Sequence, residues 1–169
     1  AARDPHAIRP MVLGKIKDGY IIASETCAFD TIGADIIRNI DAGEMIVIDE
    51  NGVRTVCQKK GKVSHCLFEY IYFARPDSQV DNRSIYTARI EIGRQLARES
   101  PVDADIAMQA PDSGIASALG HAEESKIPYR DGLIKNRDVG RTFIQPTQKL
   151  REQGVKIKNH SVSRQPKAE

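Results

Sequence analysis

Three cations stand close together in the segment of residues 135–148, which reads KNRDVGRTFIQPTQ. Lys135, Arg137 and Arg141 alternate with small or polar residues, so neither a helix face nor a strand face would bury them. Gly140 allows the backbone to come close to an anion, and charged nitrogen donors are strong ligands of phosphate. The segment is therefore a candidate phosphate-binding loop. The alternative is a solvated basic connection, because basic clusters are common on protein surfaces.

A second candidate site is the polar turn Asp112-Ser113-Gly114, which lies between a predicted strand and a predicted helix. The free amides of a helix start and the positive end of its dipole favour anions at such a turn. The chemistry suits a pyrophosphate. The alternative is that Asp112 or Ser113 only caps the first amides of the helix, and one turn can do both.

Cysteines and histidines give no complete metal site within the chain. Cys27, Cys57 and Cys66 are odd in number and contain no CxxC pair, which argues against a disulfide framework and against a zinc site. The four histidines show no metal-ligand spacing such as HxxxH. We therefore expect Cys27 and Cys57 to be buried or idle thiols.

The composition is that of an ordinary globular protein. The chain has 169 residues, 40% of them hydrophobic and 28% charged, and a net charge of +2. It lacks the basic excess of a nucleic-acid binder, so we expect no nucleic-acid partner. No apolar run approaches the roughly 20 residues that cross a bilayer, and no signal peptide is evident. We expect a cytoplasmic protein without a membrane partner.

Short strands and turns dominate the first half of the chain. Apolar or alternating runs predict strands at residues 11–13, 20–24 and 44–49. Asn51-Gly52 follows the third run and is a strong hairpin signal. Isoleucines near helical spacing predict a helix over residues 30–40, with Gly43 as a stop. The lysine-rich stretch 58–64 has no apolar period and reads as a linker.

The second half alternates helices with strands. An amphipathic pattern predicts a helix over residues 85–99, a buried strand follows at 105–110, and an alanine-rich helix at 115–124. A further short strand at 133–134 and a helix at 146–153 complete the pattern. This alternation indicates an α/β fold with a mostly parallel sheet.

Four segments together resemble one enzyme family. They read ARDPHAIRPMVLG at residues 2–14, ASETCAFDTIGA at 23–34, HCLFEYIYFARPDS at 65–78 and IKNRDVGRTFIQPTQKLREQGVKIK at 134–158. In sequence and in order they are similar to amidophosphoribosyltransferase, the glutamine-dependent enzyme that opens purine synthesis. The resemblance covers the chain from its first residues to about Lys158.

The resemblance implies a junction between two domains. Residues 1–60 look like the closing part of a class II glutamine amidotransferase domain, which has an N-terminal-nucleophile fold of the α+β kind. Residues 61–65 would be the linker, and residues 66–158 the opening part of a type I phosphoribosyltransferase domain, which is α/β. Residues 159–169 lack apolar periodicity and would form a disordered tail. The full-length parent is expected to be a homo-oligomer.

The resemblance also implies an activity. The parent reaction makes 5-phosphoribosylamine from phosphoribosyl pyrophosphate and glutamine, through ammonia, as the first step of IMP biosynthesis. This chain begins at Ala1 and shows neither the family's N-terminal cysteine nucleophile nor its paired aspartates with an Arg-Gly-Thr loop. We therefore expect the isolated chain to be inactive. The alternative is a non-catalytic remnant that acts as a phosphate-binding or interaction protein.

Site roles follow from the same resemblance. The turn at Asp112 would line the phosphoribosyl pyrophosphate pocket, with Ser113 near a magnesium ion. The loop with Lys135, Arg137 and Arg141 would close over the substrate and exclude water. Asp138 replaces the tyrosine of the family pattern KNRYVGRT, whose ring helps to wall an ammonia channel.

Cys66 matches one of the four iron–sulfur ligands in those relatives that carry a cluster. A cluster normally needs four thiolates, and Cys27 and Cys57 do not match the other three. The alternative for Cys66 is a buried thiol.

Overall fold

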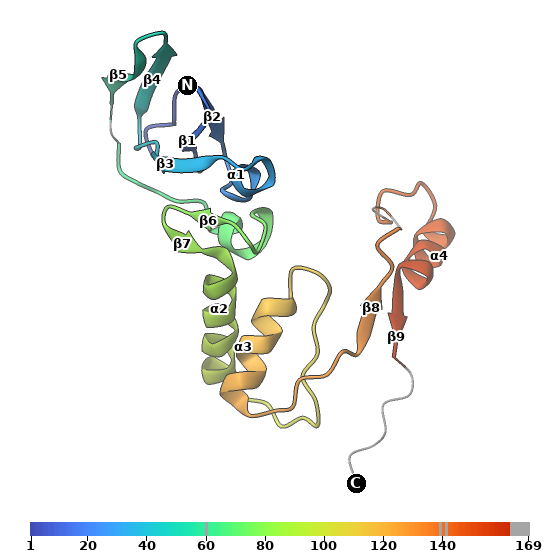
Figure 1. Ribbon diagram of the computed structural model, residues 1–169. Coiled ribbons are helices and arrows are strands. Elements are labelled where there is room, and N and C mark those ends of the chain that lie inside the picture. The colour runs from blue at the N-terminus through green and yellow to red at the C-terminus, as the bar shows by residue number, and fades with distance from the viewer. Residues whose placement is uncertain (60, 139, 141, 163–169) are drawn as a thin grey trace. The chain divides into compact units, whose positions relative to one another are not determined.

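The computed structural model describes residues 1–59, 61–138, 140 and 142–162. The chain forms two compact units, Ala1–Ala88 and Arg89–Glu169, which we describe separately (Figure 1). The first unit consists mainly of short strands and the second mainly of helices, so the chain is a mixed α/β protein.

The first unit is built on a three-stranded antiparallel sheet in the order β2-β1-β3. Its strands are β1 (Val12–Ile16), β2 (Gly19–Ala23) and β3 (Asp35–Asn39), and helix α1 (Cys27–Ile32) connects β2 to β3. Leu13, Ile40 and Ile46 form a buried apolar cluster. Strands 11–13 and 20–24 of the sequence analysis are thereby confirmed to within a few residues.

The helix predicted over residues 30–40 is wrong in its second half. Gly33 adopts a left-handed φ of 67° and its amide bonds to the Asp30 carbonyl, which ends α1. The chain then extends as β3 and pairs with β1. The isoleucines of this stretch suit a strand as well as a helix. Pairing with β3 satisfies the backbone groups on the edge of β1 that does not face β2.

A second sheet in this unit is the hairpin of β4 (Glu44–Asp49) and β5 (Gly52–Gln58). Asp49 pairs with Gly52, and Gly52 has a φ of 99°, which glycine adopts without a steric penalty. The predicted strand 44–49 and the Asn51-Gly52 turn are confirmed.

Residues on both sides of the predicted linker 61–65 pack in the first unit. They include the π-helix η1 (Glu69–Phe73) and the hairpin of β6 (Gln79–Val80) and β7 (Arg83–Ser84). Arg9 Nη1 lies 2.6 Å from Glu69 Oε1, and the buried Arg3 binds Asp81 through two nitrogens at 2.9 Å. The family boundary at 61–65 stays a prediction, while residues 61–88 share a compact unit with residues 1–60.

The second unit contains two helices whose backbones touch. Helix α2 (Ile85–Glu99), which begins at the end of the first unit, matches its predicted bounds, and α3 (Ile115–Ser125) differs from its predicted end by one residue. A Cβ on Gly93 would lie 1.9 Å from the Ser117 carbonyl oxygen. Glycine therefore allows the helices to approach more closely than side chains normally permit.

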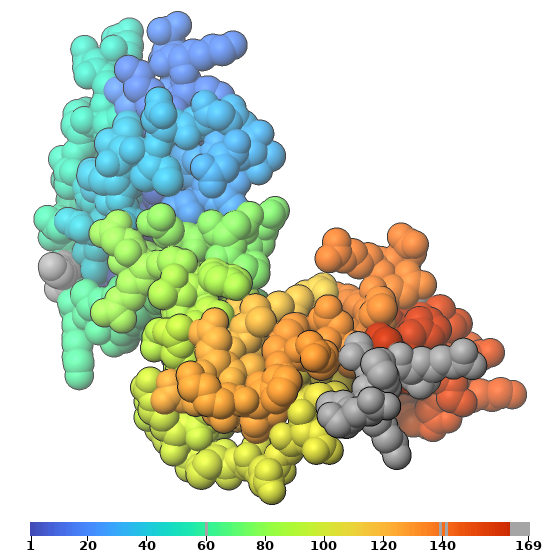
Figure 2. Space-filling model, turned by 60° about the horizontal axis from the view of Figure 1, so that its bottom comes forward, coloured from blue at the N-terminus to red at the C-terminus, as the bar shows by residue number. Residues whose placement is uncertain are grey.

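The mostly parallel sheet is not found in the described part of the second unit. Strand β8 (Leu133–Lys135) pairs antiparallel with β9 (Asn159–Ser161), which follows helix α4 (Gln148–Lys158). Residues 105–110 form one isolated parallel bridge, Ala107 to Tyr129, instead of a buried strand. Figure 2 shows the yellow atoms of this loop against the orange atoms of the segment after α3.

The predicted tail is also corrected at its start. Residues 159–161 form β9, because their backbone completes the pairing of β8. Residues 163–169 lie outside the described residues.

Ala7 has a left-handed φ of 52°. This backbone conformation is unfavourable by about 1 kcal/mol for alanine, because of its Cβ, whereas glycine adopts it freely. We expect Ala7→Gly to stabilise the first unit by roughly 0.5–1 kcal/mol, measured by urea unfolding. Gly33→Ala is the matched reverse change, since its φ is 67° and no atom lies within 4 Å of a new Cβ. It should destabilise by a similar amount, and equal signs for the two variants would contradict the expectation.

Candidate site at the start of helix α3

The predicted turn lies directly before α3. The Gly114 amide donates to the Ala110 carbonyl at 3.1 Å, and the Ile115 amide donates to the Asp112 carbonyl at 3.3 Å. The N-cap residue of α3 is Gly114, and no side chain caps it. The alternative that Asp112 or Ser113 caps the helix with its side chain is therefore wrong. Both residues are exposed, and the Asp112 carboxylate has another partner.

That partner is Lys135, the first cation of the predicted phosphate loop. Lys135 Nζ forms an ion pair with Asp112 Oδ2, so the structure brings the two candidate sites together. The Lys135 side chain is 25% exposed and that of Asp112 is 51% exposed. The pair is accessible to a ligand, and Asp112 lies two residues before Gly114, the N-cap of α3. Anions are favoured near such a helix start.

The rest of the basic loop is only partly described. Arg137 is exposed, and Arg141 lies outside the described residues. Asp138 is exposed and donates its amide to Asn136 Oδ1 at 3.0 Å. The Asn136 amide donates to the Lys158 carbonyl at 2.7 Å, and Lys158 Nζ reaches the Gly140 carbonyl at 3.1 Å. The loop is thus tied to the end of α4.

Gln109, Tyr129 and Asp131 form a polar network that was not predicted from the sequence. These residues lie within a few positions of Asp112 and Lys135 in the sequence. Gln109 is buried, with 7% of its surface exposed, and its amide nitrogen donates to Asp131 Oδ1 at 2.9 Å. The Tyr129 hydroxyl lies 2.6 Å from Gln109 Oε1 and 3.1 Å from Asp131 Oδ1. A polar residue inside a stretch predicted as a buried strand was the only signal in the sequence.

Tyr129 should ionise later than an ordinary tyrosine. Its pKa is raised by burial, which penalises the phenolate, and by the hydrogen bond and the negative charge of Asp131. We expect a difference titration of the parent chain against Tyr129→Phe, followed by phenolate absorbance, to show a tyrosine pKa above 10. Asp131→Asn should lower it, and a pKa unaffected by Asp131→Asn would contradict the assignment.

Oxygen donors at the turn suit magnesium better than the thiols suit a cluster. Magnesium takes oxygen ligands and is often held by one or two carboxylates together with substrate phosphates, and Asp112 and Ser113 offer a carboxylate and a hydroxyl. Cys66 is a half-buried free thiol. Within the described residues, no group of three or more His, Cys, Asp or Glu could hold a metal ion.

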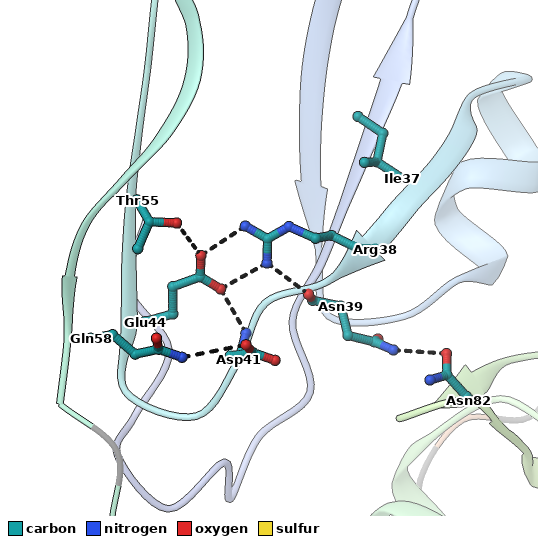
Figure 3. Close-up of a pocket in the computed structure, with 8 residues that line it drawn as sticks. All are labelled: Ile37, Arg38, Asn39, Asp41, Glu44, Thr55, Gln58 and Asn82. Carbon is teal, nitrogen blue, oxygen red and sulfur yellow. Dashed lines mark hydrogen bonds and ion pairs between the residues drawn. The ribbon is translucent and has the colours of Figure 1, made fainter.

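A cavity of about 600 Å³ in the first unit is the other candidate (Figure 3). Glu44 lies at its wall and accepts from Arg38 at 2.7 and 2.8 Å, from the Thr55 hydroxyl at 2.6 Å and from the Asp41 amide at 2.8 Å. The bond to Arg38 holds the Glu44 pKa at about 2. Because both carboxylate oxygens already have two donors, we assign this network to the fold rather than to a ligand.

No helix in the described residues is both long and apolar enough to cross a membrane.

Comparison with known proteins places the chain beside one group of enzymes. No family profile matches it. It is 49% identical over 158 residues to the amidophosphoribosyltransferase of Mycobacterium tuberculosis, and the match covers 94% of this chain and 30% of the relative. It is 54% identical over 160 residues to the amidophosphoribosyltransferase of Synechocystis, and this match covers 92% of the chain and 32% of the relative. The chain therefore spans about a third of the relatives it matches.

Solved structures give the same result. An allosteric regulatory enzyme of purine biosynthesis matches with a TM-score of 0.83 and 49% identity, over 94% of this chain and 34% of that chain. A glutamine phosphoribosylpyrophosphate amidotransferase from Bacillus subtilis, complexed with ADP and GMP, matches with a TM-score of 0.82 and 49% identity. Its match covers 94% of this chain and 35% of that chain.

Proposed function

We propose that this chain, which matches about a third of amidophosphoribosyltransferase in sequence and in fold, binds the pyrophosphate end of phosphoribosyl pyrophosphate at the start of α3. The observation that supports this most is the meeting of Asp112 and Lys135. The two residues come from segments that were each predicted to bind phosphate, and they lie 23 positions apart in the chain.

The cationic and the oxygen-bearing side chains of the proposed site would have different roles. Lys135 would hold a phosphate oxygen as a charged donor, and the amides at the start of α3 would hold another. Magnesium held by Asp112 and Ser113 would neutralise the charge that builds on the departing pyrophosphate. Arg137 and Arg141 would close the loop over the substrate and keep water away from the sugar carbon.

In the complete enzyme the proposed reaction is a displacement at the sugar. The bond from C1 to the pyrophosphate oxygen breaks and its electron pair leaves with the pyrophosphate. Ammonia released from glutamine forms the new bond to C1 and loses a proton, which gives phosphoribosylamine. Asp138 would stand where relatives wall the ammonia passage, and a hydrated carboxylate is a poor apolar wall.

The test is calorimetric titration of the chain with magnesium pyrophosphate and with phosphoribosyl pyrophosphate. Lys135→Ala should weaken both affinities by about tenfold or more, since a charged hydrogen bond contributes roughly 1.5–3 kcal/mol. Lys15→Ala, which removes an exposed cation of β1, is the charge-matched control and should bind like the parent. Equal affinity of the parent and Lys135→Ala would refute the proposed site.

A further inference from the structure

Two segments of the second unit run side by side toward Asp112 and Lys135. The Ala107 amide donates to the Pro128 carbonyl at 2.9 Å, and the Arg130 amide donates to the Ala107 carbonyl at 3.0 Å. This is a parallel bridge, so both segments leave it in the same direction. Further along, one segment reaches Asp112 and the other reaches Lys135.

Beyond the bridge, side chains replace the backbone ladder. Gln109 Nε2 donates to Asp131 Oδ1 at 2.9 Å and lies 3.5 Å from the Leu133 carbonyl. The Tyr129 hydroxyl completes the network at 2.6 Å from Gln109 Oε1. Gln109 is buried, Tyr129 is half-buried and Asp131 is exposed, and each has a partner in the network. Hydrogen bonds that link all three side chains hold the two segments in one arrangement.

The segments also touch on an apolar side. A Cβ built on Gly132 would lie 2.2 Å from the Met108 sulfur, so Met108 packs directly on the Gly132 backbone. Along the two segments the contacts run from 107 with 129, through 108 with 132 and 109 with 131 and 133, to 112 with 135. A shift of one segment by one residue would break all of them at once.

We propose that Gln109 is a positioning residue that, with Tyr129 and Asp131, sets the register between the turn at Asp112 and Lys135. The proposal deepens the proposed function and rests on it. Gln109 touches no proposed ligand. It acts by keeping the lysine opposite the turn, so that an anion meets both together and does not have to assemble its own site.

The amide of Gln109 has a specific hydrogen-bonding requirement. It must accept from the Tyr129 hydroxyl with one end and donate to the Asp131 carboxylate with the other. A glutamate at position 109 has nearly the same shape but can only accept hydrogen bonds when ionised. Its carboxylate would then lie opposite the Asp131 carboxylate, and the two would share a single donor, the Tyr129 hydroxyl. An asparagine at position 131 could turn its amide toward that glutamate and restore a donor.

These rules define a cycle of variants with matched shapes. At a temperature where every variant is folded, Gln109→Glu should weaken the affinity for magnesium pyrophosphate by about tenfold, because the segments lose their register. Asp131→Asn should stay within about threefold of the parent, since an amide oxygen can replace the carboxylate oxygen. The double variant should also return to within about threefold of the parent.

A second measurement works without a ligand. The ammonium signal of Lys135 in nitrogen-15 NMR should report its ion pair with Asp112, and this signal should be lost in Gln109→Glu and recovered in the double variant. An unchanged signal in Gln109→Glu, or a double variant as impaired as the single, would overturn the positioning role. A parent that binds no pyrophosphate would instead refute the proposed function, and the NMR signal would still decide the role of Gln109.

Discussion

Replacing Gly120 with alanine is expected to cost the second unit about 3 kcal/mol or more in free energy of unfolding. A Cβ on Gly120 would lie 2.0 Å from the Ile90 carbonyl oxygen and 2.8 Å from its carbon. Both atoms belong to the backbone of α2, so no side chain can move aside. The helices would have to separate at this point, which would disrupt their close packing.

Whether Gly120→Ala lowers or raises the free energy of unfolding shows which of two opposing contributions is larger, helix propensity or the close backbone contact. On helix propensity alone, glycine to alanine inside a helix stabilises by up to about 1 kcal/mol. The close backbone contact must therefore outweigh propensity for the variant to be destabilised. The measurement is denaturant unfolding followed by helical circular dichroism. Gly140→Ala is the control in the same unit, because no atom lies within 4 Å of its new Cβ, and a stabilised Gly120→Ala would contradict the expectation.

The ion pairs between the two helices do not change this expectation. Arg94 bonds to Glu123 at 2.7 Å and Arg98 bonds to Glu124 at 2.9 Å. Exposed pairs of this kind contribute at most about 1 kcal/mol each, because water and salt screen them. Close packing at Gly93 and Gly120 is the stronger constraint on how α2 and α3 lie against each other.

Local signals in the sequence predicted the elements that local interactions determine. Helix α2 and strand β4 have their predicted bounds, and the Asn51-Gly52 turn forms its hairpin, because periodicity and turn residues decide such elements. The error over residues 30–40 has a tertiary cause. Its isoleucines suit both structures, and only the need of β1 for a pairing partner selects the strand.

The candidate site could be predicted residue by residue but not as an arrangement. Asp112 and Lys135 were each recognised from the chemistry of their own segments, whereas their ion pair depends on contacts between those segments. Gln109 gave almost no signal, because a glutamine in an apolar stretch usually lies at a surface. The parallel sheet was predicted from alternation alone, and alternation does not say which strands pair.

Glu44→Gln is expected to destabilise the first unit by on the order of 2–3 kcal/mol at neutral pH. The Glu44 side chain is 4% exposed, and its carboxylate joins β4 to Arg38 of β3 and to Thr55 of β5. A neutral amide would accept fewer of these bonds and would leave Arg38 without its counter-charge. The measurement is amide hydrogen exchange along β3, β4 and β5, with Glu50→Gln in the neighbouring turn as the exposed control.

The pH dependence follows from the same carboxylate. Its pKa is about 2 in the folded chain and 4.5 for an ordinary glutamate, so the folded state binds the proton more weakly than the unfolded state. The stabilisation is therefore complete above about pH 4.5 and is lost as the pH falls toward 2. The parent should lose stability across this window, whereas Glu44→Gln, which has no proton to gain, should lose less. The two stability curves should converge at low pH, and a constant gap between pH 2 and pH 7 would show that the Glu44 charge is not what stabilises the three strands.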